Sequence, residues 1–373
     1  GKLTGRVGRW NLGALSVRQD EFETIAPDNA TVARATANLL EESNVGMIVT
    51  EGNPGSNVAN SLAGVDFRYR NSRLAGNKVV EVNAWLQESD TEDAIGDQSA
   101  YGVRFAAPNN TGWRGDVGFT RLGESFEPGL GFLNRPGIQS LNFGTFYRHR
   151  PRDGLLRSIS GGYDAERIEL LNGELQSQEV DYRLLEVESQ FGDALELEYS
   201  AEQEQLDEPF EIWDGIVLPA GHYSFAAPSI GFETADQRKV WGGIEYRNGE
   251  FYDGDREEIA GEINWRPSGR LRTSLGYEYN DVDLPEGSFI ARLAFFTTDV
   301  AFSSHLSWVT RIQYDNASEL VGINMRLHWI PEAGREAYLV LNHNLEDSPT
   351  DVDDRFRSST SEAVAKFAYT FRF

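Results

Sequence analysis

The chain ends with the sequence AVAKFAYTFRF, residues 363–373. Apolar and aromatic side chains occupy every second position of this stretch: Ala363, Ala365, Phe367, Tyr369, Phe371 and Phe373. The positions between them are more polar, with Lys366, Thr370 and Arg372 among them. A period of two residues is typical of a β-strand whose two faces meet different surroundings. We therefore expect the chain to end in such a strand, with Phe373 as its last residue.

The same alternation recurs upstream, for example in residues 271–280 and 321–329. A water-soluble β-sandwich would alternate in the same way, so the placement of the aromatic residues decides between the two folds. The apolar faces repeatedly end in Trp or Tyr: Tyr199, Tyr246, Trp265, Tyr277, Trp308, Tyr314 and Trp329. Aromatic girdles of this kind mark the two membrane interfaces of a transmembrane β-barrel. The sequence therefore favours a membrane barrel over a soluble sandwich.

Composition limits the classes of protein that fit. Charged or amide residues interrupt every apolar run, so no stretch approaches the roughly 18 consecutive apolar residues of a membrane-spanning helix. The 373 residues include no Cys, which excludes disulfides and thiolate metal sites and fits a secreted chain. The net charge of −25 argues against nucleic acid as a partner, because phosphate binding needs an excess of Lys and Arg. No signal peptide is recognisable, so we expect a mature chain or a fragment.

Turn residues divide the chain into connections of two kinds. Short ones contain Gly, Asn, Ser or Pro, as at 107–112 and 331–335, and longer ones are mostly acidic, as at 88–98 and 205–222. Short periplasmic turns and longer external loops are typical of bacterial outer-membrane barrels. We expect an all-β fold, a transmembrane antiparallel up-and-down β-barrel of about 20 strands, with about 18–22 as the range. It would form a single domain over residues 1–373 in the cell outer membrane, with both termini periplasmic.

Four motifs point to a known family. They are GFLNRPG at 131–137, LDEPF at 206–210, GEFYDGD at 249–255 and YEYNDVDLP at 277–285. In combination they resemble Gram-negative outer-membrane proteins of unknown function in which a family 9-like carbohydrate-binding domain precedes a C-terminal barrel. The resemblance covers nearly the whole chain and implies an outer-membrane barrel associated with carbohydrate. The upstream carbohydrate-binding domain is absent from this sequence, so its sugar-binding residues cannot be carried over.

If the apolar face meets lipid, the opposite face lines a water-filled lumen, and the charges on it are unevenly distributed. A basic arc is expected from Arg68, Arg70, Arg104, Arg114, Arg148 and Arg326. An acidic arc is expected from Glu186, Glu188, Glu196, Glu198, Glu245 and Glu262. Opposed arcs would create a transverse field that orients dipolar solutes. The alternative is that these charges solvate a wet wall and pair locally across strands.

Two of the long connections are poorly suited to extend freely into water. Residues 205–222 hold the constriction candidates Phe210, Trp213 and Asp214 within an apolar run. Residues 126–138 contain Pro and Gly at positions that fix a compact shape. We expect both loops to fold inward and constrict the pore. The alternative is that they pack on the rim or on each other.

Motifs for catalysis are lacking. The sequence has no Gly-x-Ser-x-Gly elbow, His-Glu-x-x-His helix, phosphate loop or dinucleotide fingerprint. The acidic runs lack the spacing of a Ca²⁺-binding EF-hand loop, so we expect no metal, no cofactor and no catalytic residue. Only His343, near Glu346 and Asp347, could belong to a hydrolase on the rim.

The sequence therefore predicts a non-enzymatic channel, surrounded by outer-membrane lipid, that passes small polar solutes with saccharides among them. One alternative is a plugged or sealed barrel that anchors a periplasmic or surface partner protein. The sequence supports this alternative because a barrel of about 20 strands is roughly 40 Å across. Side chains alone cannot fill a lumen of that width. The rim hydrolase is a third alternative.

Overall fold

The computed structural model describes residues 1–74, 76–347 and 356–370. Within these residues there are 23 β-strands, of which 21 join one sheet and two form a separate hairpin. The predicted all-β fold is confirmed, and the number of strands in the sheet lies within the predicted range. In the same part of the chain, no helix is long and apolar enough to cross a membrane. The predicted terminal residues Phe371 and Phe373 lie outside the described residues.

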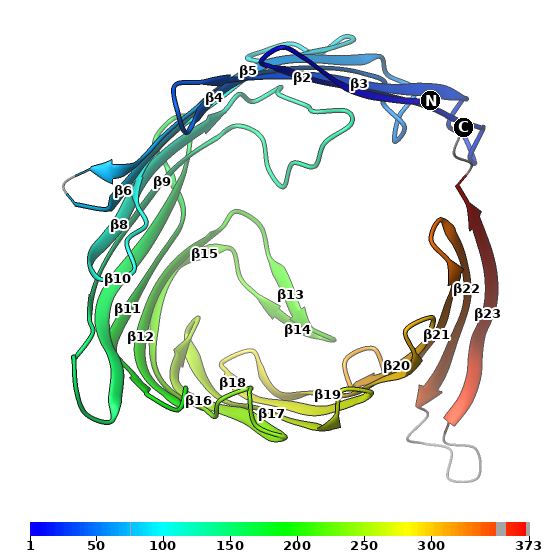
Figure 1. The fold of residues 1–373 in the computed structure, drawn as a ribbon. Coiled ribbons are helices and arrows are strands. Elements are labelled where there is room, and N and C mark those ends of the chain that lie inside the picture. The colour runs from blue at the N-terminus through cyan, green and yellow to red at the C-terminus, as the bar shows by residue number, and fades with distance from the viewer. Residues whose placement is uncertain (75, 348–355, 371–373) are drawn as a thin grey trace. The chain divides into compact units, whose positions relative to one another are not determined.

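The chain divides into two compact units, and the first comprises Gly1–His149, Ser160–Tyr182 and Glu202–Gln205. In this unit the strands β1 to β9 follow one another in the sheet, and each pairs antiparallel with the next strand in the sequence (Figure 1). These strands are β1 (Lys2–Val7), β2 (Trp10–Gln19), β3 (Asp28–Leu39), β4 (Ser43–Glu51), β5 (Asn60–Leu74), β6 (Lys78–Thr91), β7 (Ser99–Ala107), β8 (Gly112–Leu122) and β9 (Ile138–His149).

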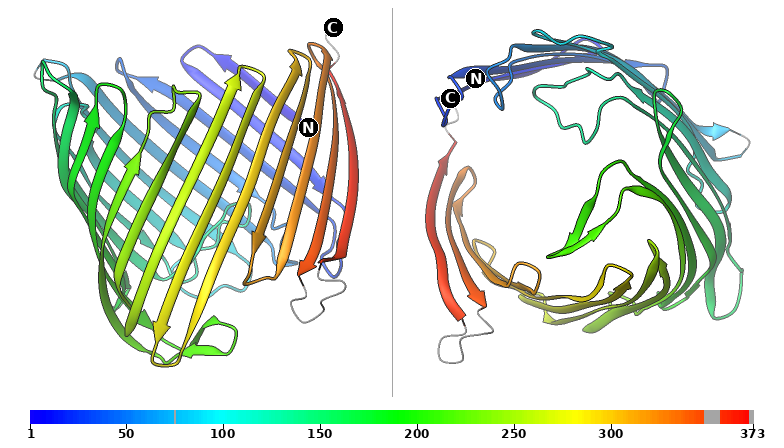
Figure 2. Two further views of the ribbon diagram at one scale, coloured as in Figure 1. Left: turned by 90° about the horizontal axis from the view of Figure 1, so that it is seen from below. Right: turned by 180° about the vertical axis from the view of Figure 1, so that it is seen from behind.

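The second unit comprises Arg150–Ile159, Arg183–Ala201 and Leu206–Phe373. Its strands β15 to β23 again pair antiparallel in chain order (Figure 2). They are β15 (Gly221–Glu233), β16 (Val240–Phe251), β17 (Gly254–Ser268), β18 (Leu271–Leu284), β19 (Gly287–Ser303), β20 (Leu306–Asp315), β21 (Leu320–Glu332), β22 (Arg335–Asp347) and β23 (Phe356–Tyr369). The separate hairpin consists of β13 (Phe210–Trp213) and β14 (Ile216–Leu218). Three strands contribute to both units: β10 (Leu156–Leu170), β11 (Leu175–Ser189) and β12 (Ala194–Leu206).

The strand pairings show which residues share a face, because cross-strand partners point to the same side of a sheet. In the first unit Val65 pairs with Leu86, and both side chains are exposed. On the opposite face Arg68 pairs with Asn83, which pairs in turn with Arg104. One face is thus apolar and the other polar, as the alternation predicts.

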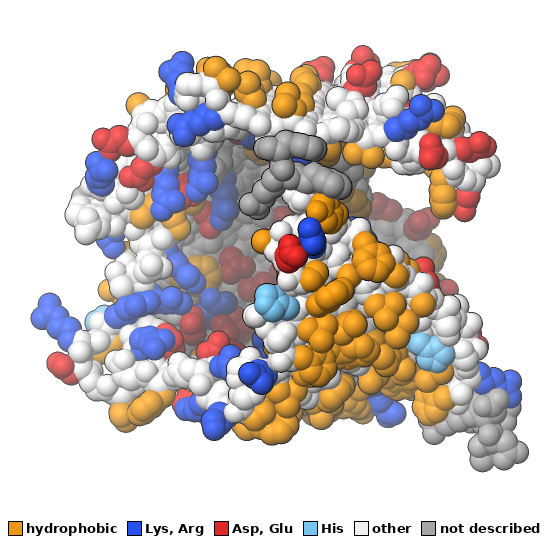
Figure 3. All heavy atoms as spheres, turned by 45° about the vertical axis from the view of Figure 1, so that its right-hand side comes forward, with side chains coloured by type: hydrophobic (Ala, Val, Ile, Leu, Met, Phe, Trp, Pro, Cys, Tyr) orange, Lys and Arg blue, Asp and Glu red, His pale blue; other side chains and the backbone are white. Residues whose placement is uncertain are grey.

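The second unit repeats this division. Ile263 pairs with Leu275 on the apolar face, and both are exposed, whereas Glu262 pairs with Gly276 on the polar face. Figure 3 shows the hydrophobic side chains of this unit gathered into a continuous field on the surface turned toward the viewer. A field of exposed apolar side chains this broad is unfavourable in water and fits contact with lipid.

Buried apolar clusters are small, because a wall one sheet thick buries side chains only where a loop folds back on it. One cluster lies in each unit, formed by Leu62, Ala100 and Phe126 in the first and by Ile216, Leu218, Val282 and Leu284 in the second.

Some connections between strands differ from the loops predicted from the sequence. The sequence also predicts acidic loops at 250–255 and 281–288, but the structure has turns of only two residues there, at 252–253 and 285–286. The charged residues beside these turns belong to the strands: Asp255 pairs with Glu250 and with Asp283. The loop at 52–59 was not expected, although its sequence GNPGSNVA is rich in turn residues.

Candidate functional site

The polar face of the first unit carries five of the six arginines of the predicted basic arc. Strand pairings place Arg68, Arg70, Arg104, Arg114 and Arg148 on one face of β5, β7, β8 and β9. Arg68 contacts Glu81 at 3.3 Å, and Arg104 contacts Asp116 at 3.0 Å. Arg70 lies 3.7 Å from Glu42. The guanidinium of Arg114 lies over the ring of Phe146, 4.7 Å from its centroid.

The sixth arginine, Arg326, lies on β21 of the second unit, where its strand neighbours are Val309 and Val340. The predicted acidic residues lie in the second unit as well. Arg183 on β11 is in ionic contact with Glu186 at 3.9 Å and Glu198 at 3.1 Å, and also contacts Glu196.

The remaining acidic residues also have local partners. Glu188 pairs with Arg157 at 2.6 Å, and Arg247 lies 3.6 Å from Glu245. Glu262 accepts a hydrogen bond from Asn264 at 2.9 Å. Most of the predicted arc residues therefore contact an oppositely charged neighbour, whereas Glu262 contacts an amide and Arg114 an aromatic ring. Whether they also produce a transverse field stays a prediction.

The β13–β14 hairpin falls within the loop predicted at 205–222. In Figures 1 and 2 it lies on the concave side of the strands of its own unit. Trp213 stacks on Phe289 of β19, with 4.7 Å between ring centroids. Ile216 and Leu218 are buried against Val282 and Leu284 of β18. The hairpin is thus packed on the polar side of the wall.

The other two constriction candidates are exposed side chains of this hairpin. Phe210 begins β13 and Asp214 lies in its turn, next to Gly215. Gly215 has a φ of 75°, a left-handed conformation that suits glycine. Its N–H donates to the Glu211 carboxylate at 2.9 Å. The turn therefore presents Asp214 to water, and Phe210 is exposed at the start of β13.

The loop at 123–137 also folds onto the concave side of the strands of its own unit (Figure 1). Its Phe126 is buried against Leu62 and Ala100. Asn60, which is 4% exposed, donates to the carbonyl of Glu127 at 2.8 Å and accepts from the N–H of Gly129 at 3.0 Å.

Two further contacts hold this loop. The N–H of Glu127 donates to the Ser89 hydroxyl at 3.1 Å, and Arg135 donates to Gln176 at 3.0 Å. Sequence reasoning missed Asn60, Ser89 and Gln176 because each lies within a strand and looks like an ordinary polar wall residue. Only the folded loop shows what they bind.

A cavity of about 610 Å³ lies beside this loop. Asn53 and Ser56 from the loop at 52–59 line it, together with Glu124 and Glu127. Phe132 also lines the cavity and is 87% exposed.

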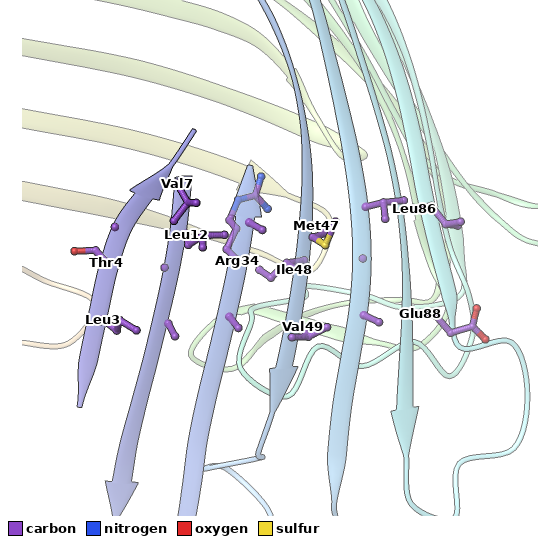
Figure 4. Close-up of a pocket in the computed structure, with 18 residues that line it drawn as sticks. Leu3, Thr4, Val7, Leu12, Arg34, Met47, Ile48, Val49, Leu86 and Glu88 are labelled. Carbon is purple, nitrogen blue, oxygen red and sulfur yellow. The ribbon is translucent and has the colours of Figure 1, made fainter. Parts of the chain in front are cut away.

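A second cavity, of about 740 Å³, is a groove on the apolar face of the first unit. Figure 4 shows Leu3, Leu12, Met47, Val49 and Leu86 along it. Its apolar lining belongs to the face that fits lipid, so it is not part of the polar site.

Two loop carboxylates are held by hydrogen bonds outside the strands. Asp97 accepts from the Ser99 hydroxyl at 2.6 Å, from the Ser99 N–H at 3.0 Å and from Arg121 at 2.6 Å. These three contacts lower the pKa of Asp97 from 3.8 to about 2. In the turn between β11 and β12, the Arg238 guanidinium and the Ala235 N–H lower the pKa of Asp193.

The rim hydrolase hypothesis depended on His343. The structure places its Nδ1 2.7 Å from the Ser361 hydroxyl. Glu346 accepts instead from Ser359 at 2.9 Å, and Asp347 from Tyr314 at 3.1 Å. The three residues are thus distributed among different partners. Among the described residues, no group of three or more His, Asp or Glu side chains is arranged to hold a metal ion.

No protein-family model and no curated protein matches the chain. Solved structures share its fold. A mutant of the ferric enterobactin receptor PfeA from Pseudomonas aeruginosa aligns with 95% of this chain and 71% of its own, with a TM-score of 0.60 and 10% identity. The siderophore receptor PirA from Pseudomonas aeruginosa aligns with 98% of this chain and 74% of its own, with a TM-score of 0.61 and 11% identity. The chain therefore has the fold of outer-membrane receptor barrels. At this identity the likeness concerns the fold and not the ligand.

Proposed function

We propose that the chain is an outer-membrane channel for small polar solutes, with saccharides among them. The observation that carries the proposal is the position of two segments, the β13–β14 hairpin and the loop at 123–137. Each folds onto the polar face of its own unit and is anchored there by buried side chains. Loops fixed in this way would narrow a water-filled passage and select solutes by size.

The two-faced wall supports the location. The exposed apolar face would meet lipid, and the face with paired charges would meet water. Apart from the Arg183 cluster, in which three carboxylates share one cation, one-to-one pairs such as Arg104 with Asp116 and Arg157 with Glu188 keep the wall wetted without a strong net attraction for either sign of ion. Such a wall suits uncharged polar solutes.

We propose further that the short turns face the periplasm and the longer loops the exterior. Under this orientation β23 runs toward the periplasm, as expected for the C-terminus. β1 would then begin at the exterior, because it is antiparallel to β2 and leads into the short turn at Gly8 and Arg9. This proposal therefore departs from the expectation that both termini are periplasmic. Labelling of intact cells at a cysteine introduced at Lys2 or at Asp93 tests this orientation. Both cysteines should be labelled, because both positions would lie at the exterior.

A liposome-swelling assay tests the permeation proposal. We expect vesicles that contain the refolded chain to swell in isotonic arabinose and glucose, and more slowly in the larger stachyose. Vesicles without protein are the control. An absence of swelling in every sugar, with a correctly folded chain, would favour the alternative of a sealed barrel that anchors a plug or a periplasmic partner protein.

A further inference from the structure

The cavity beside the loop at 123–137 has the size and lining of a binding site, which solute passage alone does not require. Three connections of the first unit contribute to it, through Asn53, Ala94 and Glu124. Its volume of about 610 Å³ falls within the range of small-molecule sites, about 300–1,000 Å³. It would lie at the external mouth if the longer loops face the exterior.

Phe132 is the apolar feature of this cavity. It is 87% exposed although the loop that carries it is fixed on both sides. On one side Phe126 is buried, and the Gly131 N–H donates to the Pro128 carbonyl at 2.6 Å. On the other side Arg135 is bonded to Gln176. A phenyl ring held in water by a rigid loop is a preformed surface for an apolar face of a ligand.

The polar groups that line the cavity include two carboxylates, which accept hydrogen bonds, and the amide of Asn53, which is a neutral donor. Glu127 accepts from the Asn53 side-chain amide at 3.3 Å, and the Asn53 N–H donates to Asp28 at 2.8 Å. Asn53 is therefore fixed in place. Glu124 supplies a second carboxylate. The described lining residues include no Lys or Arg, so the cavity has no group that would attract an anion.

One class of ligand combines an apolar face with many hydroxyl donors. The C–H face of a pyranose ring stacks on an aromatic ring, and its hydroxyls donate to carboxylates in charge-assisted hydrogen bonds. We infer that this cavity binds a neutral oligosaccharide, with Phe132 as the stacking platform and Glu124 and Glu127 as hydroxyl acceptors. The inference rests on the proposed function for its role in capturing a solute before passage, but the binding itself does not require conduction.

Saturation-transfer difference NMR on the full chain in detergent micelles tests the binding. The probes are three neutral trisaccharides: maltotriose, raffinose and mannotriose. We expect transfer to at least one of them, reduced about tenfold by Phe132→Ala, retained by Phe132→Trp and reduced severalfold by Glu124→Gln. Phe22→Ala is the matched control, since Phe22 is an exposed phenylalanine on a different loop of the same unit, and it should leave transfer unchanged.

The inference fails if none of the three sugars receives transfer, or if Phe132→Ala leaves transfer intact. Displacement of a bound trisaccharide by spermidine would identify a site for cations and would also overturn it. These results are separate from the test of the channel. Sugar binding by a chain that gives no swelling would leave the inference standing and remove the channel, whereas swelling without sugar binding would do the reverse.

Discussion

The indole ring of Trp213 stacks on the phenyl ring of Phe289, with 12° between the ring planes. This contact joins β13 to the wall strand β19. β13 and β14 form a separate two-stranded sheet, which is not hydrogen-bonded to the strands of the wall. Side-chain packing by Trp213, Ile216 and Leu218 therefore fixes its position.

Replacing Trp213 by Ala should loosen the hairpin. An aromatic pair contributes about 0.5–1.5 kcal/mol beyond the area that it buries. Trp213 is only partly buried, so its burial adds a part of the roughly 1.5–3 kcal/mol that a fully buried large apolar side chain contributes. We expect a larger and noisier single-channel conductance and faster chymotrypsin cleavage at Phe210. Trp113→Ala is the control, because Trp113 is an exposed tryptophan on the apolar face. Equal conductance and equal cleavage in Trp213→Ala and the unaltered chain would refute the constriction by this hairpin.

Asn60 should be important for the loop at 123–137. Its side-chain amide donates to Thr91 and to the Glu127 carbonyl, both at 2.8 Å. Asn60→Ala removes the partner of the buried Thr91 hydroxyl and of the part-buried Glu127 carbonyl, at a cost of about 1–3 kcal/mol. A lower midpoint of urea unfolding, followed by tryptophan fluorescence, would show this loss. Asn11→Ala, at an exposed position of β2, should change the midpoint very little. Equal midpoints for the two variants would contradict the anchoring role.

The pH dependence of stability should report the contacts of Asp97. Its pKa is lowered from 3.8 to about 2 in the folded chain. A lowered pKa stabilises the fold above pH 3.8, and that contribution disappears as the pH falls through about 2. We expect the unaltered chain to be more stable than Asp97→Asn at neutral pH, with the difference vanishing near pH 2. Asp93→Asn, in the same loop, serves as the control variant. A constant difference between the unaltered chain and Asp97→Asn from pH 7 to pH 2 would rule out the ionised contact.

Arg183 should offset part of the negative charge on the wall of the second unit. It contacts Glu186, Glu196 and Glu198. Arg183→Gln leaves three carboxylates without their shared cation, so cations should be favoured in the passage. The reversal potential in a potassium chloride gradient should shift toward the cation limit. Arg73→Gln, at an exposed site that pairs with Glu41, serves as the control. An unchanged reversal potential in Arg183→Gln would mean that this cluster does not face the conducting path.

The strands could be predicted from the sequence because alternation is a local signal. Residues 271–280 and 321–329 fall within β18 and β21. The shared face of Arg68, Arg70 and Arg104 also follows from residue parity once the strands are placed. A two-residue period assigns faces without any knowledge of neighbours.

The side-chain contacts between strands were harder to predict, because they depend on the register of each strand pair. The pairing of Arg104 with Asp116 and the bond between His343 and Ser361 each join different strands. The anchors of the folded loop lie further apart: Asn60 and Glu127 are separated by 67 positions. The sequence indicates that such a loop is too structured for open water, but it does not show which wall residues hold it.

Single-channel conductance of the full chain in a planar bilayer tests the central claim most directly. The unaltered chain should give steady openings, and a variant with residues 208–219 replaced by a short Gly-Ser linker should give openings of larger conductance, because the hairpin no longer narrows the passage. Absence of openings from both proteins, after each has been shown to fold by its heat-dependent migration on gels, would contradict the channel.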